Sequence, residues 1–188
     1  MHTGLHALWM PILLSAVLVF VVSSLLHMVT KWHAGDFRAV PDEPAARKTI
    51  GALNIPPGDY VIPRPMDMNE MKSTDFAAKM NEGPVVIMTV APNGMTNMGQ
   101  TLGIWFAYSV VVSILAGYVA AHAIPVGGSY LAVFRIVGTV AFCGYSLGLA
   151  QYSIWYHKSW STTIRSMLDG LLDALLTAGA FGGRWPAA

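Results

Sequence analysis

Three long apolar stretches constrain this chain more than any other feature. They run from Leu8 to Thr30, from Leu102 to Ile124 and from Tyr130 to Tyr156, and Arg135 is the only formally charged residue within them. A helix needs about 20 residues to cross the roughly 30 Å of hydrocarbon in a bilayer. Each stretch is longer than that, so we expect an integral membrane protein built mainly of helices.

The composition supports a membrane environment and excludes some functions. Only 11% of the residues are charged and the formal net charge is +1, whereas soluble domains average about 25% charged residues. No basic surface for nucleic acid follows from this balance, so the expected partners are the lipid bilayer and other membrane protein subunits. The single cysteine, Cys143, excludes an intrachain disulfide and any zinc or iron–sulfur site made of several cysteines.

The first apolar stretch is expected to remain as a membrane anchor. No Lys or Arg precedes it, it exceeds the roughly 7–15 residues of a signal-peptide core, and Met28–His33 lacks a small-x-small cleavage motif. It ends in Lys31, Trp32 and His33, residue types that suit the lipid headgroup region.

The segment from Thr163 to Phe181 is the hardest to classify. It is rich in leucine but also contains Arg165, Asp169 and Asp173, so its hydropathy is marginal for a membrane span. Arg184-Trp185-Pro186 follows it and is typical of an exit at the interface. We predict a fourth membrane helix, capped by Ser161 or Thr162; the alternative is an amphipathic helix on the membrane surface.

The predicted fold class is therefore an all-α membrane protein with four transmembrane helices and a small α+β extramembrane insert between helices 1 and 2. Residues 1–33 comprise an N-terminal tail and the first helix, residues 34–98 the insert, and residues 99–188 the other three helices. The third helix is predicted to be continuous over the apolar stretch that starts at Tyr130.

The insert is expected to have secondary structure of its own. It contains eight of the eleven prolines, which divide it into short elements. Helices are predicted for Pro44–Leu53 and Met68–Met80. Val85–Val90 is dense in β-branched residues and predicts a strand, which pairs with Asp59–Ile62.

Basic residues predict the orientation in the membrane. Six basic residues lie near the membrane on the insert side, whereas Arg184 is the one such residue on the side of the two termini. The positive-inside rule then places the insert in the cytoplasm of a multi-pass protein of the bacterial inner membrane. The basic residues on the insert side are Lys31, Arg38, Arg47, Lys48, Lys158 and Arg165.

Charges inside the predicted helices are the first candidates for a site. Arg135 and Asp173 lie at similar depths when both are counted from the side of the membrane that holds the termini. At 1.5 Å per helical residue, the two depths differ by about 7 Å. An unpaired charge inside a membrane is costly, so we predict an Arg135–Asp173 pair, with Asp169 one turn away. The pair is either a structural clamp or part of a proton or ion path, and the sequence favours the clamp.

Histidines are candidate ligands. His27, His33 and His157 are predicted at one membrane face and His122 at the other. His27 or His157 could ligate a haem or a chlorophyll-type pigment; the alternative is interfacial histidines without a ligand. Because no His-x-x-x-His pair occurs within the three apolar stretches, we predict no resident cofactor and no metal.

Methionines gather in the insert. Seven of the eleven lie between Met66 and Met98, a density that suits either thioether ligation of Cu(I) or adaptable packing and docking. The cytoplasmic placement of the insert favours packing or docking.

Small residues at four-residue spacing mark helix contacts. Such stripes allow backbones to approach closely, either within one bundle or against a partner subunit. The helix-packing residues predicted in this way are Ser109, Ser113, Gly117 and Ala121 in the second membrane helix and Gly144 and Gly148 in the third.

Three stretches resemble a group of bacterial inner-membrane proteins of similar length. They are Trp9-Met10-Pro11 through His27-Met28-Val29, Gly83 through Thr89, and Ser153-Ile154-Trp155-Tyr156-His157-Lys158 through Thr163. The resemblance covers nearly the whole chain. It implies residence in a bacterial inner membrane and implies no activity.

No catalytic motif accompanies these features. Asn93-Gly94 and Gly127-Gly128 are turns without the strand–loop–helix context of a nucleotide-binding motif. We therefore expect no enzyme, but a non-catalytic accessory subunit of a larger membrane complex of photosynthetic or respiratory type. The alternatives are a small ion-coupled transporter that uses Arg135, Asp169 and Asp173, and a redox subunit that binds haem or a pigment.

Overall fold

The structure, a computed structural model, describes residues 4–187. The chain divides into two compact units. Met1–Phe37 and Thr96–Ala188 form a helical bundle, and Arg38–Met95 form the insert. The bundle is mainly helical and the insert mixes short helices with two strands.

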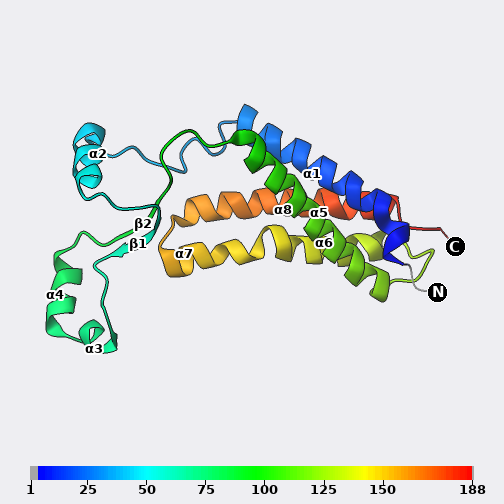
Figure 1. Ribbon diagram of the computed structural model, residues 1–188. Helices are drawn as coiled ribbons and strands as arrows, with labels where there is room; N and C mark the ends of the chain where they lie inside the picture. Colours follow the sequence, from blue (N-terminus) through cyan, green and yellow to red (C-terminus); the bar gives the residue numbers. More distant parts are fainter. Residues whose placement is uncertain (1–3, 188) are drawn as a thin grey trace. The chain divides into compact units, whose positions relative to one another are not determined.

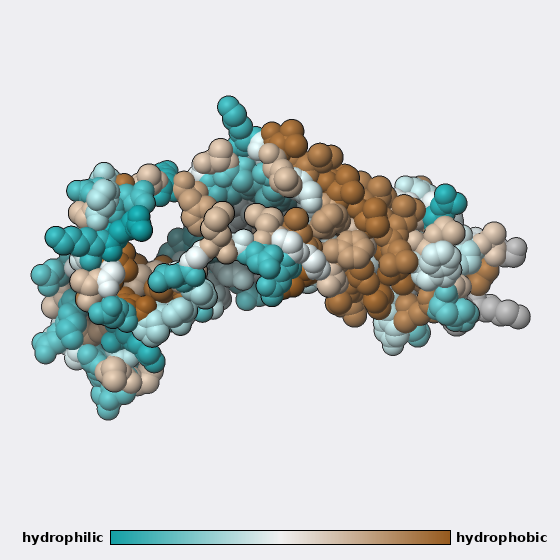
Figure 2. Space-filling model, turned by 45° about the horizontal axis from the view of Figure 1, so that its top comes forward, coloured by the Kyte–Doolittle hydropathy of each residue, from teal (hydrophilic) through white to brown (hydrophobic). Residues whose placement is uncertain are grey.

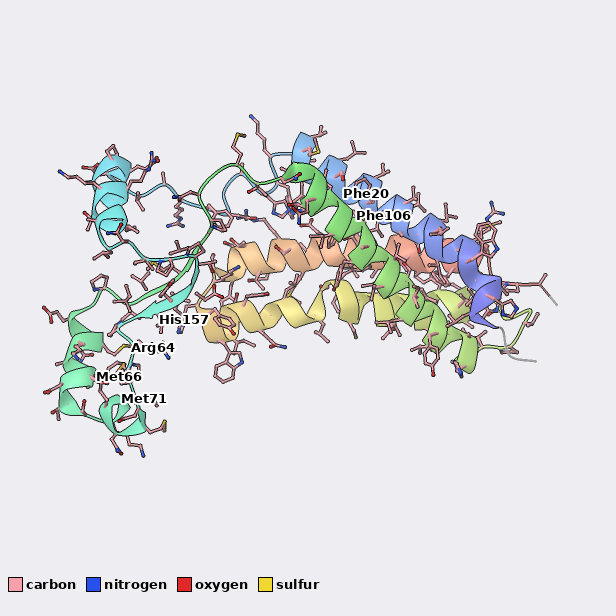
Figure 3. The ribbon with its side chains drawn as sticks, viewed as in Figure 1. Phe20, Arg64, Met66, Met71, Phe106 and His157 are labelled. Carbon is pink, nitrogen blue, oxygen red and sulfur yellow. The ribbon has the colours of Figure 1, made fainter. Side chains whose placement is uncertain are left out.

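The first two long helices of the bundle run antiparallel to each other. α1 (Trp9–Val29) follows a short 3-10 turn, and Pro11 lies in its first turn, where a missing N–H costs no hydrogen bond. Asn97 is the N-cap of α5 (Met98–Ala123), and its side chain accepts a hydrogen bond from the Gln100 N–H. Phe20 of α1 and Phe106 of α5 meet edge to face, with ring centroids 5.7 Å apart (Figure 3).

The third apolar stretch is not one continuous helix, contrary to the sequence prediction. It forms α6 (Tyr130–Tyr145), a 3-10 turn at Leu147–Leu149 and α7 (Ala150–Tyr156). Gly and Ser residues around Ser146 weaken the helix there. The Ser146 hydroxyl also donates a 2.8 Å hydrogen bond to the Met167 carbonyl oxygen, a contact that no local pattern shows.

The last helix, α8 (Trp160–Gly183), is longer than predicted and starts at a different cap. Ser159 is its N-cap residue, whereas Ser161 and Thr162 were expected, and the Ser159 hydroxyl bonds the Ser161 hydroxyl instead of a backbone N–H. α8 packs along α6 and α1 (Figure 1).

Two ends of the bundle can be distinguished. At the terminal end, the Gly127 N–H donates to the Pro186 carbonyl oxygen at 2.9 Å and the Trp185 indole donates to the Pro125 carbonyl oxygen at 3.0 Å. The opposite end, called here the loop end, contains residues 30–37 and the start of α8.

Three helical segments of the bundle are long and apolar enough to cross a membrane: Leu5–Val29, Met98–Ala123 and Tyr130–Tyr156. Figure 2 shows hydrophobic side chains over the middle of the visible face of the bundle, with more hydrophilic residues toward its ends. α8, which contains three charged residues, is not among these segments.

The interior of the bundle is apolar at the terminal end and mixed further along. Leu8, Val133, Val137 and Phe181 are fully buried in the terminal cluster. The second cluster includes Tyr145, and buried serine and threonine side chains accompany it.

The insert contains α2 (Glu43–Ala52), β1 (Gly58–Ile62), α3 (Met68–Met71), α4 (Thr74–Glu82) and β2 (Val86–Val90). β1 and β2 pair antiparallel, which confirms the predicted strand pairing. The single helix predicted for Met68–Met80 is wrong: the Asp67 and Ser73 side chains each cap a separate helix.

The methionines around α3 do not fill a core. Met66 and Met71, which are labelled in Figure 3, are exposed, and so is Met68. Packing within the insert therefore does not account for them, because a core methionine would be covered by other side chains.

Candidate functional site

One face of α8 brings polar groups into the bundle. Arg165, Asp169, Asp173 and Thr177 recur every fourth residue, so they share a face and follow each other at about 6 Å along the axis. α1 and α6 pack on α8, and the Asp173 and Thr177 side chains are buried. The opposite face is exposed and apolar, with Ile164, Leu168, Leu171 and Leu175. A helix on the surface of a soluble protein has the reverse arrangement.

An outer cluster forms at the loop end, where the turn after α1 meets α8. The His33 imidazole lies between two carboxylates: its Nδ1 is 2.6 Å from Asp36 Oδ2 and its Nε2 is 2.8 Å from Asp169 Oδ2. Backbone bonds from Ala34 to Lys31 and from Asp36 to His33 shape this turn. The His33 and Asp169 side chains are only 18% and 12% exposed.

Arg165 holds the turn against α8. Its Nη1 donates to Asp36 Oδ1 at 2.6 Å and to the Trp32 carbonyl oxygen at 3.3 Å. The Asp36 side chain is 9% exposed. A largely buried carboxylate needs such a charge-assisted bond, and the pair fixes the position of His33 next to α8.

His27 completes the outer cluster from the last turn of α1. Its Nδ1 is 2.9 Å from the Ser23 carbonyl oxygen, and its ring stacks on that of His33 with centroids 4.4 Å apart and planes 11° apart. Ligand atoms of His27, His33 and Asp169 all lie within 4.8 Å of one another, an arrangement that could hold a metal ion.

The contact between His33 and Asp169 is close without being a hydrogen bond. Within residues 4–187, neither His33 Nε2 nor Asp169 Oδ2 has a hydrogen-bond partner, although both atoms are buried. Their 2.8 Å separation is short enough for an ion pair.

An inner cluster lies deeper along the same face of α8. Asp173 is 3% exposed, and its Oδ1 has no hydrogen-bond partner in the described part of the chain. The Thr177 hydroxyl donates to the backbone oxygen of Asp173 and not to its carboxylate. Nearby, the Tyr145 hydroxyl donates to the Ser109 carbonyl oxygen at 3.3 Å.

Hydroxyl groups from all four long helical segments surround this region. The Ser15 and Ser113 hydroxyls are 2.9 Å apart, across α1 and α5. Together with Ser109, Tyr145 and Thr177 they give the inner cluster a polar lining in an otherwise apolar bundle. These groups are uncharged.

The predicted Arg135–Asp173 pair is not formed. None of the ion pairs among the described residues involves either side chain. Arg135 is exposed because the buried positions of α6, Val133 and Val137, are two residues away on each side, which is about 200° around the helix. Asp169, predicted one turn from the pair, contacts His33 instead.

The small residues singled out by spacing have different positions. Ser109, Ser113, Gly117 and Ala121 are all buried within the bundle. A Cβ at Gly144 would touch Val112 of α5 at 3.1 Å, whereas nothing lies within 4 Å of a Cβ at Gly148. The helix break at Ser146 accounts for this, since Gly148 no longer shares a face with Gly144.

The two candidate cofactor ligands are in different environments. His27 belongs to the outer cluster. His157 lies at the end of α7 (Figure 3). It has the left-handed conformation, with φ 53°, and is exposed. In the described residues, His157 joins no group of three potential metal ligands.

Sequence reasoning missed His33 and Asp36 as site residues. It did place His27 and His33 at one membrane face. The four-residue spacing of Arg165 and Asp169, at the start of the helix that returns from that face, was the remaining signal. Together these would have suggested a cluster of histidines and carboxylates.

In comparisons with known proteins, no family model, curated protein or solved structure matches the chain.

Proposed function

We propose that this chain is an ion-coupled membrane protein that admits a cation or proton into the bundle from the loop end, with Asp173 as the inner binding group. One observation supports this most strongly. Asp173 is a buried carboxyl group with an oxygen that lacks a hydrogen bond, and no basic side chain forms an ion pair with it among residues 4–187. An ionisable residue inside a membrane helix bundle is costly and commonly marks an ion or proton path.

The proposal includes α8 as a fourth membrane span. Its 24 residues extend about 36 Å, enough to cross the hydrocarbon. Its charged face is covered by α1 and α6, while its exposed face is apolar, which suits contact with lipid. Four spans place both termini on one side of a bacterial inner membrane, and the insert on the cytoplasmic side.

The polar face of α8 supports access from one end only. Arg165, Asp169 and Asp173 lead inward from the loop end in successive turns. Beyond Thr177 the interior becomes apolar, with Phe181 fully buried in the terminal cluster. This apolar cluster would act as the barrier between the inner binding group and the terminal end.

Proteoliposomes test this proposal. Purified protein is reconstituted into vesicles that contain a pH-sensitive or a Na⁺-sensitive dye, and proton or Na⁺ uptake is followed after a membrane potential is imposed. Wild-type protein should give flux above that of protein-free vesicles, and Asp173→Asn should abolish it. Asp75→Asn, which removes an exposed carboxylate from the insert, is the matched control and should retain flux. Wild-type flux in Asp173→Asn, or none in the wild type, would contradict the proposal.

A second candidate function rests on Arg135. This side chain is exposed on the outward face of α6, inside an apolar segment. Charges within a membrane usually pair, so Arg135 favours an acidic side chain on a neighbouring subunit. This supports an accessory subunit of a larger inner-membrane complex, of photosynthetic or respiratory type.

Extraction from native membranes in mild detergent tests the second candidate. We expect the wild-type chain in an assembly heavier than one protomer, and Arg135→Ala in a smaller species. Arg184→Ala, which removes an exposed arginine at the end of α8, should leave the assembly intact. Recovery of the wild type as a bare protomer would rule out docking through Arg135.

A further inference from the structure

We propose that His27, His33 and Asp169 form a binding site for a first-row transition-metal dication, with Zn²⁺ the best fit. Their ligand atoms already lie within 4.8 Å of one another at the loop end. Two imidazoles and one carboxylate are typical ligands of Zn²⁺ and Fe²⁺, and three protein ligands leave a position for water or a further ligand. Ca²⁺ and Mg²⁺ prefer oxygen ligands and fit this set poorly.

Both histidines make a hydrogen bond through Nδ1 of the kind that supports histidines in metal sites. His33 Nδ1 is bonded to the Asp36 carboxylate, and His27 Nδ1 to the Ser23 carbonyl oxygen. Each Nδ1 is therefore the donor, and each Nε2 keeps a free lone pair. In metal-binding histidines, a carboxylate or carbonyl behind the imidazole fixes this tautomer. Arg165 in turn holds Asp36 in place.

The contact between His33 and Asp169 calls for a cation. With Nδ1 as the donor, His33 Nε2 is an acceptor, and it lies 2.8 Å from the acceptor Asp169 Oδ2. Neither atom has a hydrogen-bond partner in the described residues. A shared Zn²⁺ would place the two atoms about 3.3 Å apart, from bond lengths of about 2.0–2.1 Å and tetrahedral angles. His33 Nε2 and Asp169 Oδ2 would therefore have to move apart by about half an ångström. The exposed His27 ring would also have to rotate, so that all three ligand atoms reach one metal ion.

The local charge balance also favours a cation. Arg165 neutralises Asp36, so Asp169 contributes the remaining negative charge beside two neutral imidazoles. A divalent ion would leave the cluster with a single positive charge. No step of this argument uses Asp173, so the metal site does not depend on the proposed ion path.

Metal titration of the full chain tests the site. Detergent-purified protein is freed of its affinity tag, stripped with a chelator and titrated with Co²⁺, whose visible absorption reports coordination, and then with Zn²⁺ in competition and by calorimetry. We expect one metal ion per chain. His33→Ala and Asp169→Asn should abolish this binding, and Asp36→Asn should weaken it about 10–100-fold, as supporting residues do.

Two controls keep the test specific. His122 is an exposed histidine whose Nδ1 also bonds the carbonyl oxygen four residues earlier, in Tyr118, and His122→Ala should bind metal like the wild type. Asp173→Asn should also bind normally, even if it abolishes ion flux.

His27 is exposed, so a variant at this position should fold even if the substitutions at His33 and Asp169 impair folding. His27→Gln removes a strong ligand and should weaken Co²⁺ binding, with the loss of its absorption band. Binding that survives in both His27→Gln and His33→Ala overturns the proposal, and so does a wild-type chain that binds no Co²⁺ or Zn²⁺.

Discussion

Replacing Gly170 with alanine is expected to lower the free energy of unfolding of the bundle by about 1–3 kcal/mol, a typical cost of overpacking. Gly170 is buried in α8 where the helix crosses the end of α6. A Cβ there would lie 2.7 Å from the Tyr145 carbonyl oxygen and 2.9 Å from the Ser146 Cβ. The obstacle is backbone and not the end of a flexible side chain, so α6 and α8 would have to separate.

The same substitution at Gly103 provides the matched control. Gly103 is exposed in α5, and no atom lies within 4 Å of a Cβ placed there. Alanine favours a helix over glycine by up to about 1 kcal/mol, so Gly103→Ala should be neutral or stabilising. Thermal unfolding in detergent, followed by circular dichroism, compares the two variants. Equal midpoints would show that α6 and α8 do not approach this closely.

The three segments apolar enough to cross a membrane and the strands of the insert could be predicted because they depend on local composition. Hydropathy identifies a span without knowledge of its neighbours, and the β-branched residues of Val86–Val90 indicate a strand in the same way. The break at Ser146 could not be predicted from local composition alone. It coincides with a hydrogen bond to Met167, a residue of another helix.

The error at Arg135 has a similar cause. Counting residues from the helix ends gave the depth of Arg135 and Asp173 but not the direction that each side chain faces. Direction depends on how each helix is rotated in the bundle, and packing of Val133 and Val137 turns Arg135 outward. Spacing along one helix is more informative, because Asp169 and Asp173 share a face whatever the rotation.

Asp173→Asn is expected to raise the stability of the bundle, by about 1–3 kcal/mol, the typical cost of a buried polar group that lacks a partner. Asparagine keeps the size of the side chain and removes a charge for which the described residues offer no ion pair. Its amide group can also donate to the hydroxyls near Tyr145, which a carboxylate cannot do. Functional groups often reduce stability in this way, so the gain in stability should accompany the loss of ion flux.

Asp169→Asn, one turn away on the same helix face, should also raise the stability of the metal-free protein, for a different reason. Asp169 Oδ2 lies 2.8 Å from His33 Nε2, both atoms are acceptors when the His33 proton is on Nδ1, and an asparagine amide can donate a hydrogen bond across this contact. Unfolding midpoints of the two variants, measured in the same detergent without metal, should therefore both lie above that of the wild type, and Zn²⁺ should raise the midpoint of the wild type and of Asp173→Asn but not that of Asp169→Asn. A clear loss of stability in Asp173→Asn would mean that its carboxylate has a structural partner, and the clamp interpretation of this residue would then replace the ion path.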